Sequence, residues 1–216
     1  MMVFNFIKRE RANIIWFGLV GLCLAGLALA IPFARNEMRA SKARQVLDLA
    51  RLAEGEERIQ YLLGAKLALT PEGPSGDLYD LSAQLALLQT PMDLKSAERL
   101  SWDALKRSPA RADSWARLAY IERQRSGRLN EKALTYLDHS FVVEPAGFKD
   151  FMTWRLEFMF AHWSQLPPSL QDATLRSLQM LSFWRGPAFS LKLVQGYGDA
   201  NLTRRAQIVL YGAARP

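Results

Sequence analysis

Few residues in this chain have the types and spacing that catalysis or metal binding requires. The sequence contains no G-x-S-x-G nucleophile motif, no G-x-x-x-x-G-K-[ST] phosphate-binding loop and no H-E-x-x-H zinc motif. His139 and His162 have no carboxylate three or four residues further along the chain, and the single cysteine, Cys23, lies in an apolar run. We therefore interpret both histidines as structural or surface residues, and we expect no catalytic site, metal ion or cofactor.

Basic residues outnumber acidic ones, which makes an acidic partner a hypothesis to consider. The sequence has 28 Lys and Arg residues against 21 Asp and Glu residues, a net charge of +7. Such a charge attracts polyanions, including lipid headgroups, acidic polysaccharide and nucleic acid. The excess is greatest around residues 103–132, where we predict a basic face made of Lys106, Arg107, Arg111, Arg117, Arg125 and Arg128. An ordinary solvated helix face is the alternative interpretation.

Aromatic residues concentrate after residue 115 and have two interpretations. The chain contains six Trp and eleven Phe residues. Exposed rings would offer a surface on which bases or sugars stack. We favour a core role for the rings that recur at matching positions of the repeat described below, namely Trp115, Phe151, Trp154 and Phe158.

The first element that the sequence predicts is an apolar helix at the N-terminus. After a short basic tail, residues 1–12, the chain has 23 consecutive residues without a charge. At about 1.5 Å per residue this run extends about 34 Å, enough to cross a hydrocarbon core of about 30 Å. We predict a transmembrane helix over residues 13–34, acting as a signal anchor and ending near Pro32. A cleaved signal peptide is the alternative, because A-L-A at residues 28–30 is typical of a cleavage site.

A 36-residue repeat occupies the middle of the chain. One helix of each repeat carries small residues, a proline follows it, and an aromatic residue stands six positions after the proline. Small residues let a partner helix approach closely, and the aromatic ring fills the space beside them, so we predict antiparallel helix pairs. The matching residues are Ala97 and Ala133, Ser101 and Leu137, Ala104 and Ser140, Pro109 and Pro145, Trp115 and Phe151, Leu118 and Trp154, Ala119 and Arg155, and Glu122 and Phe158.

These residues carry a family resemblance. The segments WARLA and ALTYL, followed by Pro145, resemble the tetratricopeptide repeat (TPR) pattern W-x-x-L-G-x-x-Y, A-x-x-x-F, P. The likeness is clearest over residues 97–158, and it departs from the family where Glu122 replaces Tyr and where the period exceeds about 34 residues. The resemblance implies an all-α fold, in which a TPR-like stack of antiparallel helix pairs over residues 36–216 follows the transmembrane helix.

We expect eight or nine helices in this domain, with the largest apolar side chains of each helix facing inward. Between residues 36 and 69 we predict two helices broken near A-E-G-E-E. Their expected inward residues are Val46, Leu49, Leu52, Ile59, Leu62, Leu63 and Leu67.

The TPR resemblance also implies where a partner would bind. In such stacks the first helix of each pair lines a concave groove, so one stripe on each of two helices is expected to face the partner. The expected groove residues are Asp113, Ala116, Tyr120, Arg123, Lys149, Met152, Leu156 and Met159. In the alternative interpretation, the C-terminal helices cover the last three.

The segment FMFAHWSQLPPSLQDATLRSLQMLSFW resembles the tail of small membrane-anchored proteins associated with bacterial surface polysaccharide synthesis. Taken together, the resemblances imply a non-enzymatic adaptor or scaffold that binds a partner protein or peptide in a bacterial envelope assembly. The alternative is an accessory protein of surface polysaccharide biosynthesis or export that contacts acidic glycan or lipid.

We expect the chain in the bacterial inner (plasma) membrane, as a single-pass protein with its C-terminal domain on the periplasmic or extracytoplasmic side. A short basic tail before a signal-like helix supports this orientation, whereas the positive charges on the two flanks do not favour it. We do not expect a nucleic-acid partner, because the membrane would separate a domain anchored on its outer side from the nucleic acid of the cell.

Overall fold

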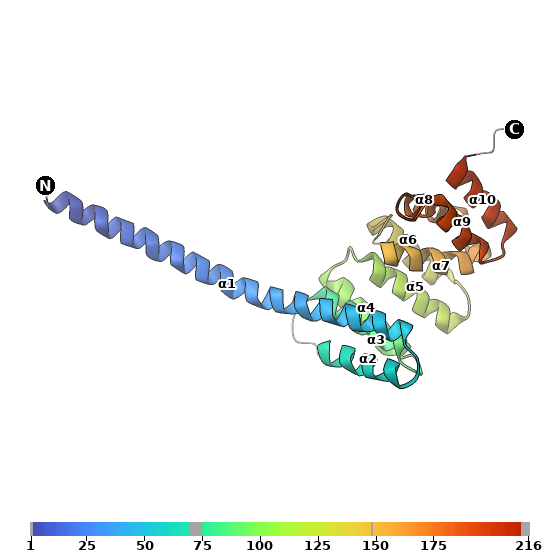
Figure 1. Ribbon diagram of the computed structural model, residues 1–216, viewed down its shortest axis with the longest axis horizontal. Coiled ribbons are helices and arrows are strands. Elements are labelled where there is room, and N and C mark those ends of the chain that lie inside the picture. Colours follow the sequence, from blue (N-terminus) through green and yellow to red (C-terminus); the bar gives the residue numbers. More distant parts are fainter. Residues whose placement is uncertain (1, 70–74, 148, 213–216) are drawn as a thin grey trace. The chain divides into compact units, whose positions relative to one another are not determined.

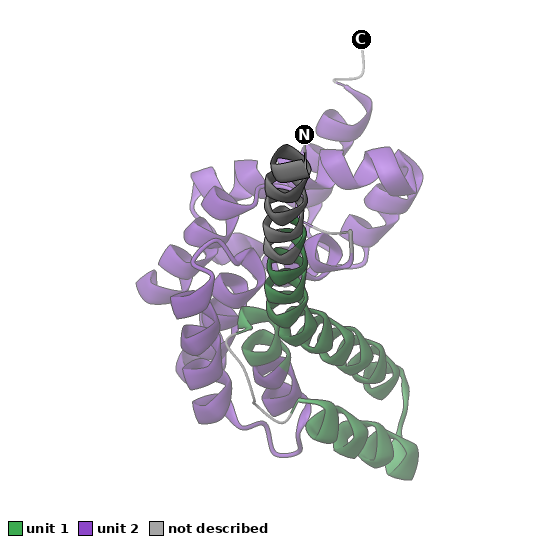
Figure 2. Cartoon of the chain, turned by 90° about the vertical axis from the view of Figure 1, so that its left-hand side faces the viewer, with its two compact units in different colours: residues 1–81 green, residues 82–216 purple. Residues whose placement is uncertain are grey.

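The computed structural model describes the backbone of residues 2–69, 75–147 and 149–212, and their side chains apart from residues 2–15, 17, 18 and 149. All regular secondary structure in these ranges is helical, with ten α-helices, one short 3-10 helix and no strand (Figure 1). The predicted all-α class is therefore confirmed. The chain divides into two compact units, residues 1–81 and 82–216, and the boundary falls inside helix α3 (Gly76–Leu88) (Figure 2).

Helix α1 (Met2–Leu52) is the longest element and includes the apolar N-terminal run. By length and composition it is able to cross a membrane. The predicted helix end near Pro32 is wrong, because α1 continues through Pro32 for another twenty residues. A proline removes one backbone hydrogen bond and crowds the carbonyl of the preceding turn. The hydrogen bonds of the turns on both sides are intact, and the helix continues despite this local loss.

In the first unit, the C-terminal part of α1 packs on α2 (Gly55–Ala68) through small residues. The buried residues of α1 recur at spacings of three and four and are mostly alanines: Ala40, Ala43, Leu47 and Ala50. Alanine lets two helix backbones approach closely, so the seam excludes bulkier side chains. The predicted inward orientation is therefore wrong for five leucine and isoleucine residues, which are exposed: Leu49, Leu52, Ile59, Leu63 and Leu67.

In the second unit, the boundaries of four helices recur at intervals of 35–37 residues, close to the 36-residue spacing of matching residues in the sequence. Helices α4 (Leu94–Arg107) and α5 (Ala112–Ser126) are followed by α6 (Glu131–Val143) and α7 (Lys149–Ala161). The ends of α4 and α6 match in detail. Ser108 (φ −145°, ψ 85°) and Glu144 (φ −150°, ψ 89°) each donate a backbone N–H to the carbonyl four residues earlier. Gly127 ends α5 in the left-handed conformation (φ 72°), which glycine adopts without steric cost.

Three further α-helices complete the second unit and enclose its core. They are α8 (Pro168–Arg185), α9 (Pro187–Gln195) and α10 (Ala200–Tyr211), preceded by a 3-10 turn at Trp163–Gln165. Helix α8 begins directly after Leu-Pro, with Pro168 in its first turn, where a missing N–H has no helical partner to lose. Buried apolar residues from α6, α7, α8, α9 and α10 form one continuous core.

A buried arginine fixes the connection between α6 and α7. Arg155 of α7 is fully buried, and its guanidinium donates to the carbonyl oxygens of Ser140, Glu144 and Pro145 at 2.8–3.1 Å. It also lies 4.0 Å from the centroid of the Phe141 ring. Burial lowers the pKa of Arg155 to about 10, so the guanidinium remains charged near neutral pH. These bonds hold α7 against the end of α6 and set which face of α7 is left exposed.

Candidate functional site

A set of aromatic rings on α5 and α7 lies partly at the surface of the second unit. We call it the aromatic strip, and it consists of Tyr120, Phe151, Trp154 and Phe158. On α7 the Trp154 ring lies parallel to Phe158, with 5.7 Å between centroids and 1° between planes, and 6.4 Å from Phe151. Tyr120 approaches from α5, with its centroid 6.2 Å from Trp154 and 5.9 Å from Phe158.

The strip arises because Phe151, Trp154 and Phe158 follow one another at helical spacings of three and four, which place them along one face of α7. Phe158 is buried, Phe151 is half-buried, and the Trp154 side chain is 38% exposed. The expectation that Trp154 belongs to the core is therefore wrong. Its ring is supported by Phe158 beneath it and presents its remaining surface to solvent.

A polar pair lies at the end of the strip. The Nε–H of Arg123 donates to Nε2 of His162 at 2.8 Å, and Nδ1 of His162 is 2.8 Å from the carbonyl oxygen of Phe158. Because Nε2 accepts, the proton of the neutral ring belongs on Nδ1, where it is donated to that carbonyl. His162 is 9% exposed, and both of its ring nitrogens have a hydrogen-bond partner. This arrangement supports a role for His162 in positioning the Arg123 side chain.

The residues predicted to line a groove divide into two groups. Tyr120 and Arg123 are partly exposed and belong to the surface just described. Asp113 is also partly exposed and pairs with Arg111 at 3.2 Å, whereas the side chain of Lys149 lies outside the described residues. The remaining four residues are fully buried and cannot contact a partner in this structure: Ala116, Met152, Leu156 and Met159.

The error on α7 is one of rotation about the helix axis. Met152, Leu156 and Met159 belong to the same core as Leu178 and Leu202, so the C-terminal helices do cover them. The alternative interpretation is correct for these three residues. Because α7 carries apolar residues on nearly all sides, its sequence did not indicate which side would be covered.

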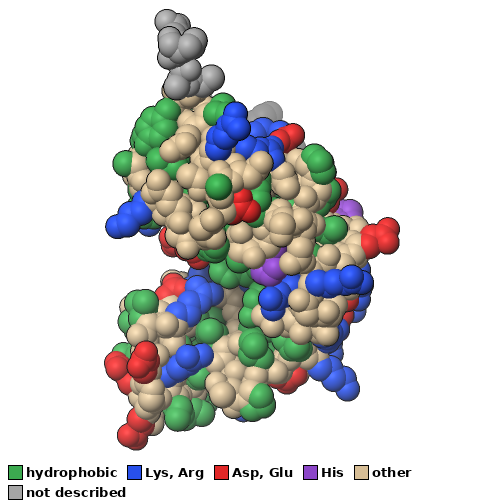
Figure 3. Space-filling view, turned by 90° about the vertical axis from the view of Figure 1, so that its right-hand side faces the viewer, with side chains coloured by type: hydrophobic (Ala, Val, Ile, Leu, Met, Phe, Trp, Pro, Cys, Tyr) green, Lys and Arg blue, Asp and Glu red, His purple; other side chains and the backbone are tan. Residues whose placement is uncertain are grey.

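The predicted basic face does not form a continuous patch of free charge. Lys106 pairs with Asp103 at 3.1 Å, Arg111 with Asp113, and Arg125 with Glu98 at 2.6 Å. Arg117 is buried, whereas Arg107 and Arg128 are exposed. On the face drawn in space-filling form, Lys and Arg side chains are scattered among acidic and hydrophobic ones (Figure 3).

Trp115 belongs to a second aromatic group that joins three helices. Its ring lies edge-on to Trp102 of α4 at 5.6 Å, and 6.0 Å from Tyr136 of α6. It also stacks on the exposed His139 at 4.8 Å. The indole N–H donates to the carbonyl oxygen of Pro109 at 3.0 Å. Trp115 thus contacts both α4 and α6, and it is half-buried and not enclosed in the core.

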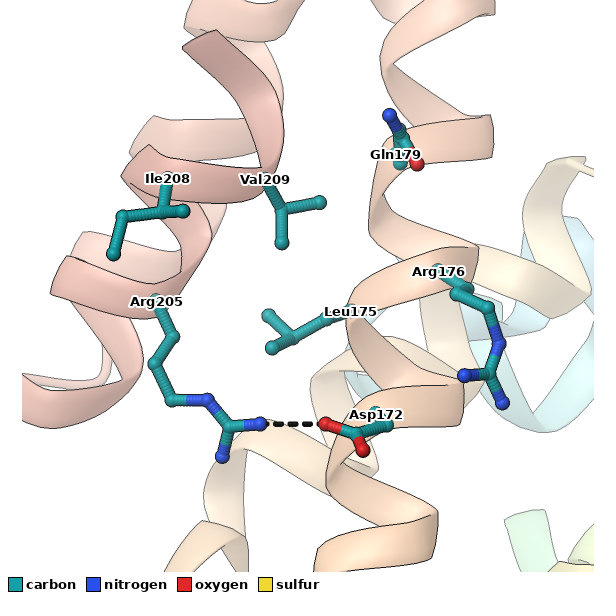
Figure 4. A pocket seen from close by; sticks show the side chains of 7 residues that line it. All are labelled: Asp172, Leu175, Arg176, Gln179, Arg205, Ile208 and Val209. Atoms are coloured by element: carbon teal, nitrogen blue, oxygen red, sulfur yellow. Dashed lines mark hydrogen bonds and ion pairs between the residues drawn. The ribbon is translucent and has the colours of Figure 1, made fainter. Parts of the chain in front are cut away.

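A shallow depression of about 340 Å³ lies between α8 and α10. Leu175 and Val209 point into it from opposite walls, and Arg205 reaches across its lower end to Asp172 at 2.7 Å (Figure 4). Nothing in the sequence marks this depression, because its two walls come from separate helices and neither carries a motif.

No group of three or more His, Cys, Asp or Glu side chains is arranged to hold a metal ion within the described part of the chain. The aromatic strip offers three apolar rings and the phenol of Tyr120. No protein family, curated protein or solved structure matches this chain. Its function is therefore inferred from the geometry of its own residues.

Proposed function

We propose that this chain is a non-enzymatic, membrane-anchored adaptor with a TPR-like stack, and that its aromatic strip binds a segment of a partner protein. The observation that carries the proposal is the half-exposed Trp154, supported on one side by Phe158 and faced by Tyr120 from α5. Tryptophan, tyrosine and arginine are the residues that most often dominate the energy of protein interfaces. A rigid ring loses little conformational entropy on binding, which favours affinity.

The TPR-like part of the proposal is supported by the matching ends of α4 and α6 and by the side-chain contacts from α5 to α7. In a TPR-like stack, α5 and α7 are the first helices of successive pairs and line the concave side. Tyr120 and Trp154 lie on these two helices, and their rings are 6.2 Å apart. The groove in this proposal is lined by the aromatic strip and Arg123, and not by Met152, Leu156 and Met159.

A protein segment is a better candidate than a polyanion for this surface. The acidic partners of Lys106, Arg111 and Arg125 already neutralise much of the predicted basic face. At the strip, by contrast, Tyr120 donates to the thioether of the half-exposed Met92, at 3.8 Å. A surface of aromatic rings with an adaptable methionine at its edge suits an apolar side chain of a protein better than a charged glycan.

The proposed setting is the plasma membrane of a bacterium, with the second unit on the extracytoplasmic side. The support for a membrane setting is the length and apolar composition of α1. The orientation is supported by the short basic tail that precedes it.

Site-specific photo-cross-linking in native membranes tests this function. A photoreactive phenylalanine replaces Trp154 in the full chain, and the same residue replaces Trp184, another half-exposed tryptophan, as a matched control. We expect a discrete protein adduct at position 154 and none at position 184. Trp154→Ala is then expected to weaken binding of the identified partner by about 2 kcal/mol, roughly thirtyfold.

Two results would contradict the proposal. One is a protein adduct at position 184 but none at 154. The other is unchanged partner binding by Trp154→Ala, with its thermal melting confirming a folded domain. If Trp154→Ala instead abolished binding of an acidic polysaccharide and no protein adduct formed, the polysaccharide accessory function would replace the adaptor function.

A further inference from the structure

The C-terminal half of α8 exposes large apolar side chains to solvent. Phe183 is 87% exposed, Trp184 54% and Met180 41%. Together with Arg176 they lie at spacings of four, three and one residue, which place all four within about a third of the helix circumference. We call these four residues the α8 face. Exposed aromatic side chains grouped in this way mark an interaction surface.

The sequence around the α8 face is rich in basic residues. Residues 173–198 contain Arg176, Arg185 and Lys192 and no Asp or Glu. The nearest carboxylate on the exposed side of α8, Asp172, is paired with Arg205 at 2.7 Å. An apolar face with basic residues near it in the chain is complementary to the surface of a bilayer, which is apolar inside and carries negative charge on its anionic headgroups.

We propose that the α8 face docks the second unit onto an anionic membrane surface, with Phe183 and Trp184 inserted at the level of the lipid headgroups. Trp and Phe side chains favour this interfacial region, and Lys and Arg residues are attracted to anionic headgroups. Each basic residue near such a surface strengthens binding roughly fivefold at physiological salt. The surface is separate from the aromatic strip, so the proposal does not depend on the adaptor function.

A lipid occupant is favoured over a second copy or another protein because the same chain carries a helix able to span a membrane. A domain tethered to a bilayer meets that surface at a high effective concentration, so even weak insertion becomes populated. A dimer formed through the α8 face would gather the Arg176 side chains of both copies, with the same charge, in one interface.

The test places a fluorescent probe beside the α8 face of the full chain. In a Cys23→Ser background, Gln179→Cys carries an environment-sensitive fluorophore, and Thr135→Cys, an exposed position on α6, serves as the control. Both proteins are reconstituted into vesicles of phosphatidylcholine, with or without phosphatidylglycerol. Both kinds of vesicle contain a quencher attached to lipid headgroups. We expect quenching at position 179 that exceeds quenching at 135, increases with phosphatidylglycerol and decreases at high salt.

Two variants separate the apolar and electrostatic contributions. Phe183→Ser with Trp184→Ser removes the inserting rings, and Arg176→Glu with Lys192→Glu reverses the charge at exposed positions. Each is expected to lower the ratio of docked to free domain by tenfold or more, while circular dichroism confirms an unchanged fold. Equal quenching at positions 179 and 135 in anionic vesicles would overturn the proposal. So would a probe at 179 that is equally shielded in detergent and in vesicles, because protein would then cover the face.

Discussion

Arg123 of α5 donates its Nε–H to Nε2 of His162, which follows α7, across 2.8 Å and 39 residues of sequence. The bond joins two helices at the end of the aromatic strip, and His162 in turn bonds the carbonyl of Phe158. The orientation of a surface arginine is therefore set by a buried histidine.

This geometry predicts the tautomer of His162. At neutral pH its proton should reside on Nδ1, which ¹⁵N chemical shifts of the imidazole would report. His162→Phe removes the acceptor from Arg123 and should cost about 1–3 kcal/mol of unfolding free energy. The matched variant His139→Phe alters an exposed ring and should cost much less. An Nε2-protonated His162, or equal losses for the two variants, would show that the bond does not form.

Arg155 should be indispensable to the second unit. Lysine has a single ammonium group and cannot reach the carbonyls of Ser140, Glu144 and Pro145 together, so Arg155→Lys leaves buried acceptors unpaired. We expect a loss of about 3–5 kcal/mol in chemical denaturation. Arg185→Lys, at an exposed position, should change stability by less than about 0.5 kcal/mol. A small effect at position 155 would mean that water or another side chain replaces the guanidinium.

Glu122 should contribute stability that depends on pH. Hydrogen bonds from Asn130 and Lys132, the latter at 3.0 Å, lower the pKa of the Glu122 carboxyl and outweigh the opposing effect of burial. Because the folded-state pKa is lower than the unfolded one, the contribution is complete above the usual pKa of a glutamate. It is lost as the pH falls through the lowered value.

The free energy of unfolding, measured by chemical denaturation from neutral pH down to acidic pH, tests this contribution. Glu122→Gln should be less stable than the wild type at neutral pH, and the difference should shrink on acidification. The same interaction raises the pKa of Lys132, so Lys132→Met should bring the pKa of Glu122 back toward its usual value. A difference between wild type and Glu122→Gln that does not change with pH would contradict the assignment.

The first segment should remain attached to the mature protein. Its uncharged run fits the thickness of a bilayer, and α1 continues without a break to Leu52. Intact mass of the protein isolated from membranes should therefore correspond to a start at Met1 or Met2. A mature start at Ile31 would instead identify residues 1–30 as a cleaved signal peptide.

Local interactions explain what the sequence alone determined. The all-helical class, the apolar N-terminal helix and the helix ends near Pro109, Gly127 and Pro145 follow from backbone chemistry within a few residues. The 36-residue spacing of matching residues was visible in the sequence for the same reason, because similar residues stand near the ends of α4 and α6. The helix end expected near Pro32 was wrong, because a proline disfavours a helix locally but does not forbid one.

Tertiary structure decided which face of each helix is buried. Ala43 and Ala50 are buried while Leu49 is exposed, because close approach of α1 and α2 requires small side chains at the seam. On α7, apolar residues surround the helix, and the choice between covering Met152 and covering Trp154 depends on helices that come later in the chain. No periodicity along one helix contains that information.

The same limit applies to the polar residues of the second unit. A charge within an apolar helix, as at Arg155, is expected at the surface unless acceptors are known to surround it. Here those acceptors are the carbonyls at the end of α6, and they converge on Arg155 only when α7 folds back against that end. Likewise, Arg123 and His162 are 39 residues apart and meet only through the packing of α5 and α7. Burial of charge and contact between distant helices are collective properties of the packed chain, so only the tertiary structure decided them.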